Sequence, residues 1–448
     1  MTEVESQRPA GLIAAHHLRR MTGRDPDERA RVATPLELLF DLTFVVAFGV
    51  SASEFAHQLA AGHVGAGLVG FAFTTFAVCW AWVNFSWFSS AYDTDDWGYR
   101  LATMLQMVGV VILTMGIPPV FSSIEEGEHV DNRVLVAGYV VMRIAMVFQW
   151  LRAARQDKAR RTACLTYAIT ISVAQCGWIA SIFLHTSVSA TMAIYIALIF
   201  VETMGPWIAE GRSGGTPWHA HHIAERYGLL TIIALGEGVL GTVASLTAVV
   251  AAQGWTVDAV LVALAGIGLT FGMWWLYFVL PAGAILHAHR DRSVAFGYGH
   301  IVIFVTIVAT GAGLHAAAYF LDHHSNLDSA QTVLTVGAPV GVYMVGIFVL
   351  YVYLVRGLDV VYAAVLLFAA VVLVAAVLLA SSGIAMGACL LIVTMAPVAV
   401  VIGFETVGHR HVENAVARAL SQPYDGDEMS TEPPSGDDNN ARADRHRP

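Results

Sequence analysis

The sequence predicts an all-α polytopic membrane protein with about twelve transmembrane helices, arranged as two six-helix parallel repeats. Three observations predict this class. First, 56% of the 448 residues are hydrophobic and only 13% are charged, whereas a soluble domain carries about 25% charged residues. Second, the apolar residues form runs of about 20 residues, the length that crosses a bilayer as a helix. Third, the basic residues lie almost entirely on one side of the predicted membrane.

Short polar connections divide the apolar sequence into the predicted spans. The two weakest divisions lie at His185-Thr186, between the fifth and sixth spans, and at Ser381-Ser382-Gly383, between the eleventh and twelfth. We expect the spans at residues 36–59, 66–90, 99–121, 133–154, 161–184, 188–208, 222–250, 256–281, 294–320, 333–355, 359–380 and 384–406.

The distribution of Lys and Arg tests this count. If the N-terminus is cytoplasmic, the tails and every second loop hold all the basic residues except Arg133, Arg143 and Arg226. Arg133 falls in an opposite loop, and the other two fall within spans. An excess of Lys and Arg in cytoplasmic loops is what the positive-inside rule describes. We therefore predict that both termini are cytoplasmic.

The same pattern divides the chain into five regions. The N-terminal segment lacks the apolar core of a secretory signal peptide, and the C-terminal tail is rich in Pro, Ser, Asp and Asn. We expect a cytoplasmic N-terminal segment at residues 1–34, a first six-helix repeat at 35–208, a cytoplasmic linker at 209–221, a second six-helix repeat at 222–408 and a cytoplasmic, mostly disordered acidic tail at 409–448.

The two repeats are predicted from the starts of the first and seventh spans. Glu37–Ala47 aligns with Glu225–Leu235, and Glu, Leu and Thr recur at the same offsets, 188 residues apart. Six spans bring the chain back to the side where it began, so the repeats would have the same orientation. The alternative is that any two apolar helices align this well. In transporters built from such repeats, the working site lies between them near the midplane.

Ionisable residues within the spans are candidates for that site. Glu37 and Asp41 lie four residues apart on one face of the first span, close to its cytoplasmic end. Acids at a helix N-terminus also complement the helix dipole, which is the alternative explanation for both residues and for Glu225. Glu237 is different because it lies about 18 Å along its helix from Glu225, in mid-membrane. A carboxylate there costs roughly 2.5 kcal/mol or more on insertion scales.

Two arginines are candidate partners for Glu237. Arg226 lies eleven residues before it, close to three full turns, so the two residues share a face. Arg143 lies in mid-membrane in the fourth span and needs a buried acid. Glu237 is the most economical partner for Arg143, and Glu202 in the sixth span is the second candidate. A buried structural hydrogen bond is the alternative role for Glu237.

The loops offer weaker signals. The loop between the second and third spans contains Asp93, Asp95 and Asp96. Three acids in one loop suggest cation binding. Cytoplasmic histidines such as His219 and His221 are more typical of solvated loops than of a zinc site, because no fixed set of four ligands is present. We therefore predict neither a metal site nor a cofactor. No nucleotide-binding or hydrolase motif is present, and nothing points to nucleic acid.

Three stretches resemble the signature stretches of the bacterial low temperature requirement protein A family. They are Leu36–Val45, Tyr92–Asp96 followed by Arg100, and His222–Glu237, and the resemblance covers residues 33–410. It implies a multipass protein of the bacterial inner membrane and brings no established reaction. It adds weight to the acids and arginines of the motifs. With Arg143, the candidate ligand- or ion-binding residues are Glu37, Asp41, Asp93, Asp95, Asp96, Arg100, His222, Glu225, Arg226 and Glu237.

Three functions fit these observations. The first is a transporter or ion permease with a polar site at Glu237 between the repeats, whose partners would be the lipid bilayer and a small molecule or ion. The second is a membrane-embedded enzyme acting on a lipid or isoprenoid-like substrate, with a buried carboxyl as general acid. The third is a sensor or scaffold for membrane stress. The sequence does not decide between an enzyme and a non-enzyme, and it does not fix the oligomeric state.

Overall fold

The computed structural model of the chain describes residues 18–28, 31–127, 129–211, 214–357 and 360–421, and these residues form helices and no strand. Within them, twelve helical segments are long and apolar enough to cross a membrane. The predicted all-α membrane class and the number of spans are therefore confirmed, whereas the arrangement as two repeats stays a prediction. The helices are α1 Pro35–Ala60, α2 Val64–Tyr92, α3 Trp97–Met115, α4 Ile117–Glu126, α5 Arg133–Gln156, α6 Arg161–Ser181, α7 Val188–Glu210, α8 Ala220–Gln253, α9 Val257–Tyr277, α10 Ala282–Ala288, α11 Ser293–Leu321, α12 Ser329–Val355, α13 Val360–Ser381, α14 Met386–Gly403 and α15 His409–Ser421.

Both weak divisions of the sequence are confirmed, since α6 ends before His185 and α13 ends at Ser381. The third span differs from the prediction because it is broken at Gly116 into α3 and α4. Prolines occupy the first turn of α4, where their missing N–H groups cost nothing. Gly116 also touches α5, because a Cβ built on it would lie 2.2 Å from the backbone nitrogen of Leu135.

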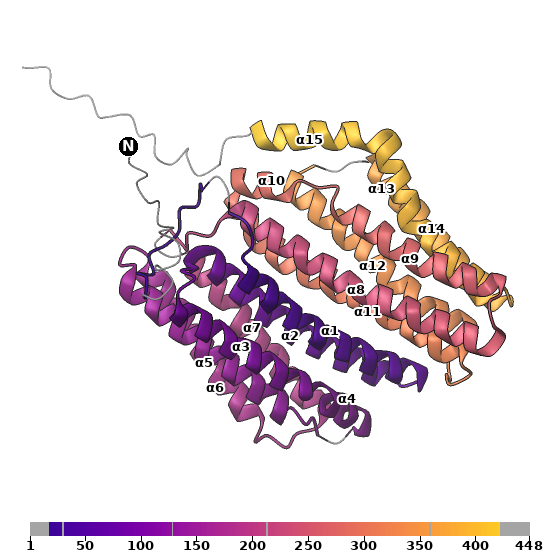
Figure 1. The fold of residues 1–448 in the computed structure, drawn as a ribbon, viewed down its shortest axis with the longest axis horizontal. Helices are drawn as coiled ribbons and strands as arrows, with labels where there is room; N and C mark the ends of the chain where they lie inside the picture. The colour runs from indigo at the N-terminus through magenta and orange to yellow at the C-terminus, as the bar shows by residue number, and fades with distance from the viewer. Residues whose placement is uncertain (1–17, 29–30, 128, 212–213, 358–359, 422–448) are drawn as a thin grey trace, which may run out of the picture.

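The C-terminal end of the described chain is a surface helix. A short π-helical segment at Phe404–Gly408 follows α14, and α15 then runs across the ends of the other helices (Figure 1). The buried residues of α15 are Val412, Ala415 and Ala419, which lie on one face at helical spacing. The sequence analysis places a mostly disordered tail from residue 409 onward. The first 13 residues of that region form a helix instead. Residues 422–448 lie outside the described residues.

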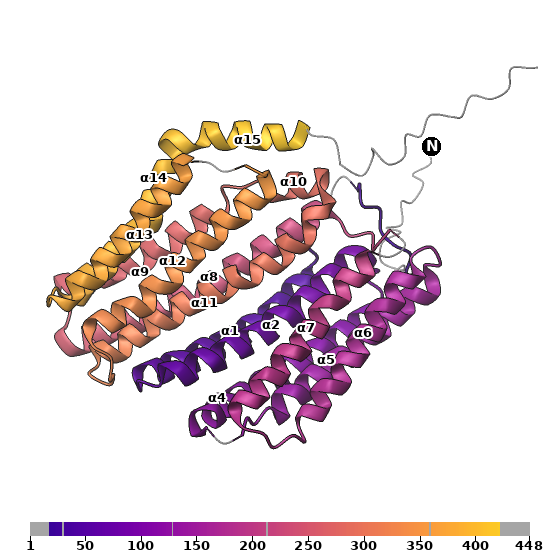
Figure 2. The same cartoon turned by 180° about the vertical axis from the view of Figure 1, so that it is seen from behind.

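The helices form two groups that lie side by side (Figures 1 and 2). Helices α1–α7 form the first half, and helices α8–α15 form the second half. Helix α1 lies between them, because it packs on α2 and α3 of its own half and on α8 and α11 of the other. Large apolar side chains cover the outer helices; Leu367 and Leu378 of α13 are 69% and 63% exposed. Such a surface suits a lipid bilayer, and the chain is a multipass membrane protein.

We call the end of the bundle at which α1 begins the N-terminal end, and the opposite end the far end. Residues 18–28 and 31–34 run across the N-terminal end and contact both halves. The Met21 N–H donates to Gln156 Oε1 (2.5 Å), and the Arg24 N–H donates to the Ala91 carbonyl (3.0 Å). The Ala33 N–H reaches Glu225 of the second half (3.2 Å). The N-terminal segment therefore covers the junction of the halves at this end.

Candidate functional site

Helix α1 begins with a capping box that fixes Glu37. The Glu37 N–H donates to the Thr34 hydroxyl (3.3 Å), and the Glu37 carboxylate accepts from the Thr34 N–H (2.8 Å). Pro35 occupies the first turn, where its fixed φ suits the start of a helix. This arrangement satisfies the free N–H groups of the first turn. It also points one oxygen of Glu37 at the second half, so capping and a second role coexist in this residue.

Arg226 of α8 joins the two first helices of the halves. Its Nη1 lies 2.9 Å from Glu37 Oε1, and its Nη2 lies 2.6 Å from Asp41 Oδ1. All three side chains are 0% exposed. The spacing of four residues on α1 places both carboxylates on one face, where a guanidinium can bind them together. Because a buried charge is stable only when it is paired, Arg226 holds α1 and α8 together.

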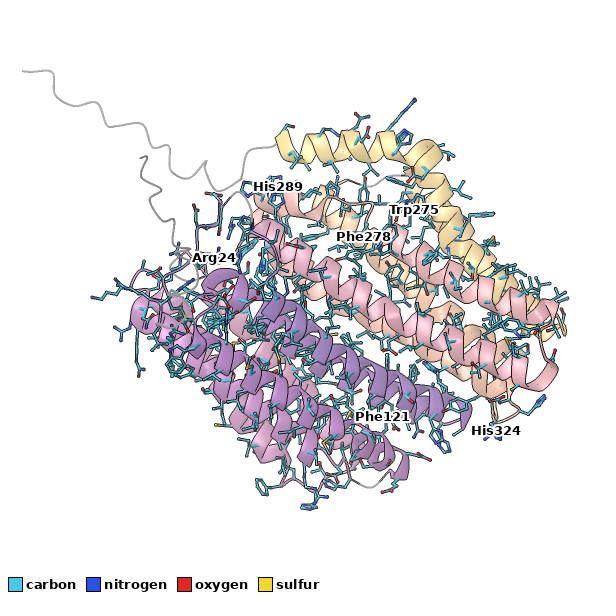
Figure 3. The ribbon with its side chains drawn as sticks, in the orientation of Figure 1. Arg24, Phe121, Trp275, Phe278, His289 and His324 are labelled. Atoms are coloured by element: carbon cyan, nitrogen blue, oxygen red, sulfur yellow. The ribbon has the colours of Figure 1, made fainter. Side chains whose placement is uncertain are left out.

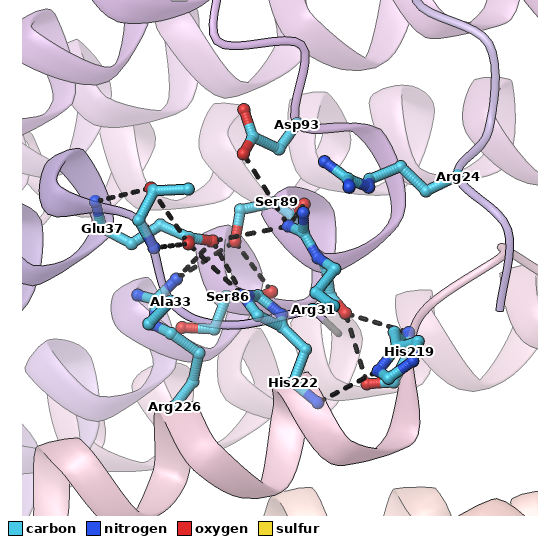
Figure 4. Close-up of polar contacts among 12 residues, drawn as sticks. Arg24, Arg31, Ala33, Glu37, Ser86, Ser89, Asp93, His219, His222 and Arg226 are labelled. Atoms are coloured by element: carbon cyan, nitrogen blue, oxygen red, sulfur yellow. Dashed lines mark hydrogen bonds and ion pairs between the residues drawn. The ribbon is translucent and has the colours of Figure 1, made fainter. Parts of the chain in front are cut away.

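Further groups complete this arrangement (Figure 4). His222 Nε2 lies 3.3 Å from the Glu37 carboxylate, one turn before Arg226. The Trp82 indole donates to Asp41 Oδ1 (2.6 Å), and the Arg226 guanidinium also donates to the Ser89 hydroxyl (3.1 Å). We call Arg31, Glu37, Asp41, Asp93, His222 and Arg226 the buried ion cluster.

Arg31 connects Asp93, in the loop after α2, with Glu37 of the buried ion cluster. Its Nη2 donates to the Ser89 carbonyl (2.9 Å) and lies 3.8 Å from both Glu37 Oε1 and Asp93 Oδ2. Asp93 is 7% exposed. Burial raises the pKa of Asp93 to about 6, and the negative charge of Glu37 adds to this effect, while Arg31 opposes it. Asp93 is thus a carboxyl group that changes charge near neutral pH at the N-terminal end.

The other two acids of this loop have different partners. Asp95 binds Arg100 through two contacts of 2.8 Å, and both side chains are about half exposed. Asp96 caps α3 by accepting from the Tyr99 N–H (2.9 Å), and its carboxylate also pairs with Arg152. Burial raises the pKa of Asp96, but the hydrogen bonds and charge of Arg152 outweigh this effect and hold the pKa below its ordinary value. The three acids are therefore divided among separate protein partners.

Glu237 lies apart from the buried ion cluster, deep in α8. It is 2% exposed, and it makes no hydrogen bond or ion pair with any residue that the structure describes. Glycines allow its close contact with two helices. A Cβ built on Gly49 of α1 would lie 3.1 Å from Glu237 Oε1, and one built on Gly311 of α11 would lie 2.7 Å from Glu237 Cβ. Glu237 thus sits where the first half meets the second.

The expected pairing of Glu237 with Arg143 is wrong. Arg143 lies in the first half with Glu202, and the distance from its Nη2 to Glu202 Oε1 is 3.8 Å. Tyr139 links the two, because its hydroxyl donates to Glu202 Oε2 (2.6 Å) and accepts a hydrogen bond from Arg143. The second candidate partner was therefore the correct one. Arg226 is also held elsewhere, by Glu37 and Asp41.

Comparisons with known proteins agree with the resemblance of the motifs. The model of the bacterial low temperature requirement A protein (LtrA) family matches residues 32–397. The chain belongs to the LtrA family. It is also 24% identical over 322 residues to the uncharacterized protein RA0937 of Rhizobium meliloti (strain 1021), covering 68% of this chain and 73% of that protein. No solved structure matches the chain.

The structure brings together parts of all three LtrA signature stretches. Glu37 and Asp41 come from the first, Asp93 from the second, and His222 and Arg226 from the third, and all of them lie in the buried ion cluster. The other six candidates lie outside it. Asp95 and Arg100 form an exposed pair, Glu225 accepts from the N-terminal segment, and Glu237 lies three turns deeper. Asp96 and Arg143 are held by the separate pairs described above.

Sequence reasoning missed three polar partners in this LtrA protein. Trp82, Ser89 and Arg31 are not among the candidate residues of the sequence analysis. A signal for the serine existed, because Ser86, Ser89 and Ser90 interrupt an otherwise apolar span. The indole of Trp82 gave no such signal, since a tryptophan in a span is usually apolar packing.

The histidines of the LtrA chain do not gather into a metal site within the described residues. His219 instead caps α8, because its Nδ1 accepts from the His222 N–H (3.2 Å) and its Nε2 lies 2.8 Å from the Glu28 carbonyl. His221, two positions after His219, is exposed.

Proposed function

We propose that this LtrA protein is a transporter or ion permease of the bacterial inner membrane, with its polar site at Glu237 and both termini in the cytoplasm. The observation that carries the proposal is the position of Glu237, a buried carboxyl at the junction of the halves that has no partner among the described residues. A lone carboxylate in an apolar environment is unstable unless it binds a cation or takes up a proton. Glu237 is suited to carry either of them.

Polar side chains continue from Glu237 toward the far end and support this proposal. His315 of α11 is one turn beyond Gly311 and lies against Gly241 of α8, where a built Cβ would be 3.4 Å from its ring. Half-buried Glu54 of α1 follows, and the His57 ring lies 6.3 Å from that of Tyr319. These groups border the contact between α1 and α11. They offer a proton or cation successive polar positions between Glu237 and the far end.

The N-terminal end differs because the buried ion cluster and the N-terminal segment close it. In a transporter this end must open for the ion to pass, so Arg226 would exchange partners or move with α8 during the cycle. The proposed site is thus closed toward the N-terminal end and bordered by polar groups toward the far end. Opening and closing of the two sides in turn is how transporters with a midplane site move their substrates.

In this proposal, residues 35–208 and 222–408 are two parallel repeats. Neighbours recur in the same order: α1 packs on α2 and α3 as α8 packs on α9 and α11, and α5 packs on α6 as α12 packs on α13. In the alignment of the repeats with an offset of 188 residues, Gly49 corresponds to Glu237. These two residues also touch in the structure. The contact between the halves is not symmetric, since α1 packs on α11 while α8 makes no comparable contact with α3 in the described chain.

The test is flux through purified protein in liposomes that enclose a pH-sensitive dye, with Na⁺ or K⁺ gradients as separate arms. We expect Glu237→Gln to fold normally, because Gln keeps the shape, and to lower the flux more than about tenfold if the residue lies on the path. The matched control is Glu202→Gln, which removes a carboxyl that is also buried in a span but bound by Tyr139. Flux per folded molecule should survive in the control. A fully active Glu237→Gln protein would disprove the proposal.

A further inference from the structure

A cavity of about 270 Å³ lies inside the second half, at its N-terminal end. This volume is close to the lower end of the range for small-molecule sites, roughly 300–1,000 Å³. Five long helices and α15 contribute to its wall. The lining residues used below are Ala224, Tyr277, Phe278, His300, Leu350 and Val412.

The chemistry of the wall excludes charged ligands. The polar side chains in the wall are those of tyrosines and of two histidines, and the other lining residues are apolar. None of the lining residues is Asp, Glu, Lys or Arg. An ion would leave water here without a counter-charge, which is costly. A neutral and largely apolar molecule would instead gain by burying its surface.

A hydrogen-bonded pair gives the cavity a polar point. His300 is 1% exposed, and its Nδ1 lies 2.7 Å from the Phe296 carbonyl, which can only accept. In the neutral ring, Nε2 is then an acceptor, and it lies 2.9 Å from the Tyr277 hydroxyl. The Tyr277 O–H therefore donates to His300. The Thr231 side chain also lies within hydrogen-bonding reach of the Tyr277 oxygen. This oxygen has two acceptor positions, so one is left for a donor in the cavity.

The surroundings indicate entry from the membrane. Trp274, Trp275 and Phe278 at the end of α9 are 44%, 48% and 42% exposed, and Phe278 also lines the cavity. Figure 3 shows Trp275 and Phe278 below α15. Val412 of α15 closes the wall, and this amphipathic helix lies where the bundle meets the lipid headgroups. A molecule dissolved in the bilayer reaches such a site without crossing water.

We propose that this cavity binds a neutral amphiphile with a hydrocarbon or aromatic body and one hydroxyl group, which donates a hydrogen bond to the Tyr277 oxygen. The site is independent of the proposed transport site. Ala224 and Glu237 are both in α8, and their separation of 13 residues corresponds to about 20 Å. Binding here can therefore be measured without any flux.

The experiment uses the full chain in lipid nanodiscs and a ten-carbon alcohol that carries a photoreactive diazirine. Its methyl ether is the matched probe, because it has the same body and cannot donate. We expect saturable labelling of peptides from the cavity wall, competed by 1-decanol. Labelling by the ether should be roughly three- to tenfold weaker, as expected for the loss of a neutral hydrogen bond.

Three variants locate the effect. Tyr277→Phe should lower the affinity for the alcohol roughly three- to tenfold and leave labelling by the ether unchanged. Tyr298→Phe is the control, because it removes a tyrosine hydroxyl that donates to the Thr203 carbonyl (2.7 Å) outside the cavity. Leu350→Trp should fill the cavity and abolish labelling by both probes.

Three results would overturn the proposal. Equal labelling by the alcohol and the ether in the unmodified protein would show that the cavity does not recognise the hydroxyl group. Unchanged labelling in a folded Leu350→Trp protein would place the probe on the outer surface. Equal losses in Tyr277→Phe and Tyr298→Phe would show a general effect on the helices. The first of these comparisons needs no variant to fold.

Discussion

The buried ion cluster and Glu237 are two polar regions in one apolar bundle, and they are built in opposite ways. In the cluster, Arg226 contacts two carboxylates, and indole, hydroxyl and imidazole groups surround them. Glu237 has no hydrogen-bond or ion-pair partner among the described residues, and Gly49 of α1 and Gly311 of α11 lie directly against it. Both regions lie between α1 and α8. Their difference suggests separate roles for charges that are equally buried.

A charge that the protein pairs holds a structure together, whereas a carboxyl that it leaves unpaired is available to a mobile ion. The cost of an unpaired group must be offset by the rest of the fold, so its retention favours a functional explanation. Substitutions at the two regions should therefore separate stability from function. The next predictions sharpen this contrast.

The largest effect on stability should come from Arg226→Met. This substitution leaves Glu37 and Asp41 buried without their shared cation, which costs roughly 3–5 kcal/mol. The measurement is the unfolding midpoint in mixed micelles with increasing denaturing detergent. Arg100→Met is the control, because its pair with Asp95 is about half exposed and is worth about 0–1 kcal/mol. Equal midpoints for the two variants would show that the cluster does not hold the halves together.

An intermediate effect should come from Gly311→Ala. The added Cβ would lie 2.7 Å from Glu237 Cβ and 2.8 Å from the Glu237 carbonyl carbon, so α8 and α11 would have to separate. Such overpacking costs about 1–3 kcal/mol. The same detergent titration measures it. Gly236→Ala is the control, since nothing lies within 4 Å of a Cβ there. A tolerated Gly311→Ala would mean that the contact around Glu237 is looser than described.

The smallest effect concerns pH. The pKa of Asp93 is about 6 in the folded chain, whereas its ordinary value is 3.8. Between about pH 4 and pH 6 the folded state therefore binds more protons than the unfolded state. Stability should fall as the pH rises through this window. Asp93→Asn should remove that slope and raise stability at pH 7 by about 1–2 kcal/mol. Each pKa unit corresponds to about 1.4 kcal/mol, and the Asn amide offsets part of the gain because it is a weaker acceptor than the carboxylate for the Asp95 N–H.

Asp131→Asn provides a control of opposite sign for the pH series. Hydrogen bonds from Arg133 hold the pKa of Asp131 below its ordinary value, so this pair contributes stability that is lost as the pH falls. The Asn variant should be slightly less stable at pH 7 and equal to the unmodified protein in acid. Thermal unfolding followed by tryptophan fluorescence from about pH 2 to pH 8 measures both variants, because the contribution of Asp131 is lost only below its ordinary pKa of 3.8. A slope that persists in Asp93→Asn would assign it to another group.

The helices could be predicted from sequence because membrane insertion depends on local composition. Runs of apolar residues and the positions of Lys and Arg were sufficient for the number of spans and for both weak divisions. Gly116 escaped notice because an apolar run can contain a break without losing hydropathy. The helix at His409–Ser421 was missed because the polar residues of an amphipathic surface helix resemble those of a tail.

The candidate site could be predicted only in part. Helical spacing showed that Glu37 and Asp41 share a face, and the motif stretches pointed to Arg226. Spacing within a helix does not show which neighbouring helix it meets. For that reason the sequence could not choose between Glu237 and Glu202 as the partner of Arg143, and the more economical choice was wrong. The link between Arg226 and Asp41 likewise depends on packing between distant helices.

That link has a consequence for synthesis of the chain. Asp41 and Arg226 are 185 residues apart, and at about 5–20 residues per second the ribosome needs roughly 10–40 s to make that length. During this time α1 carries two acids whose cation does not yet exist. The nascent helix is therefore stable only with those acids among hydrated lipid headgroups or bound by an insertion factor. A chain released before residue 226 would pack α1 on α2 and α3 while leaving its two acids without their cation, a state that membrane quality-control proteases can recognise.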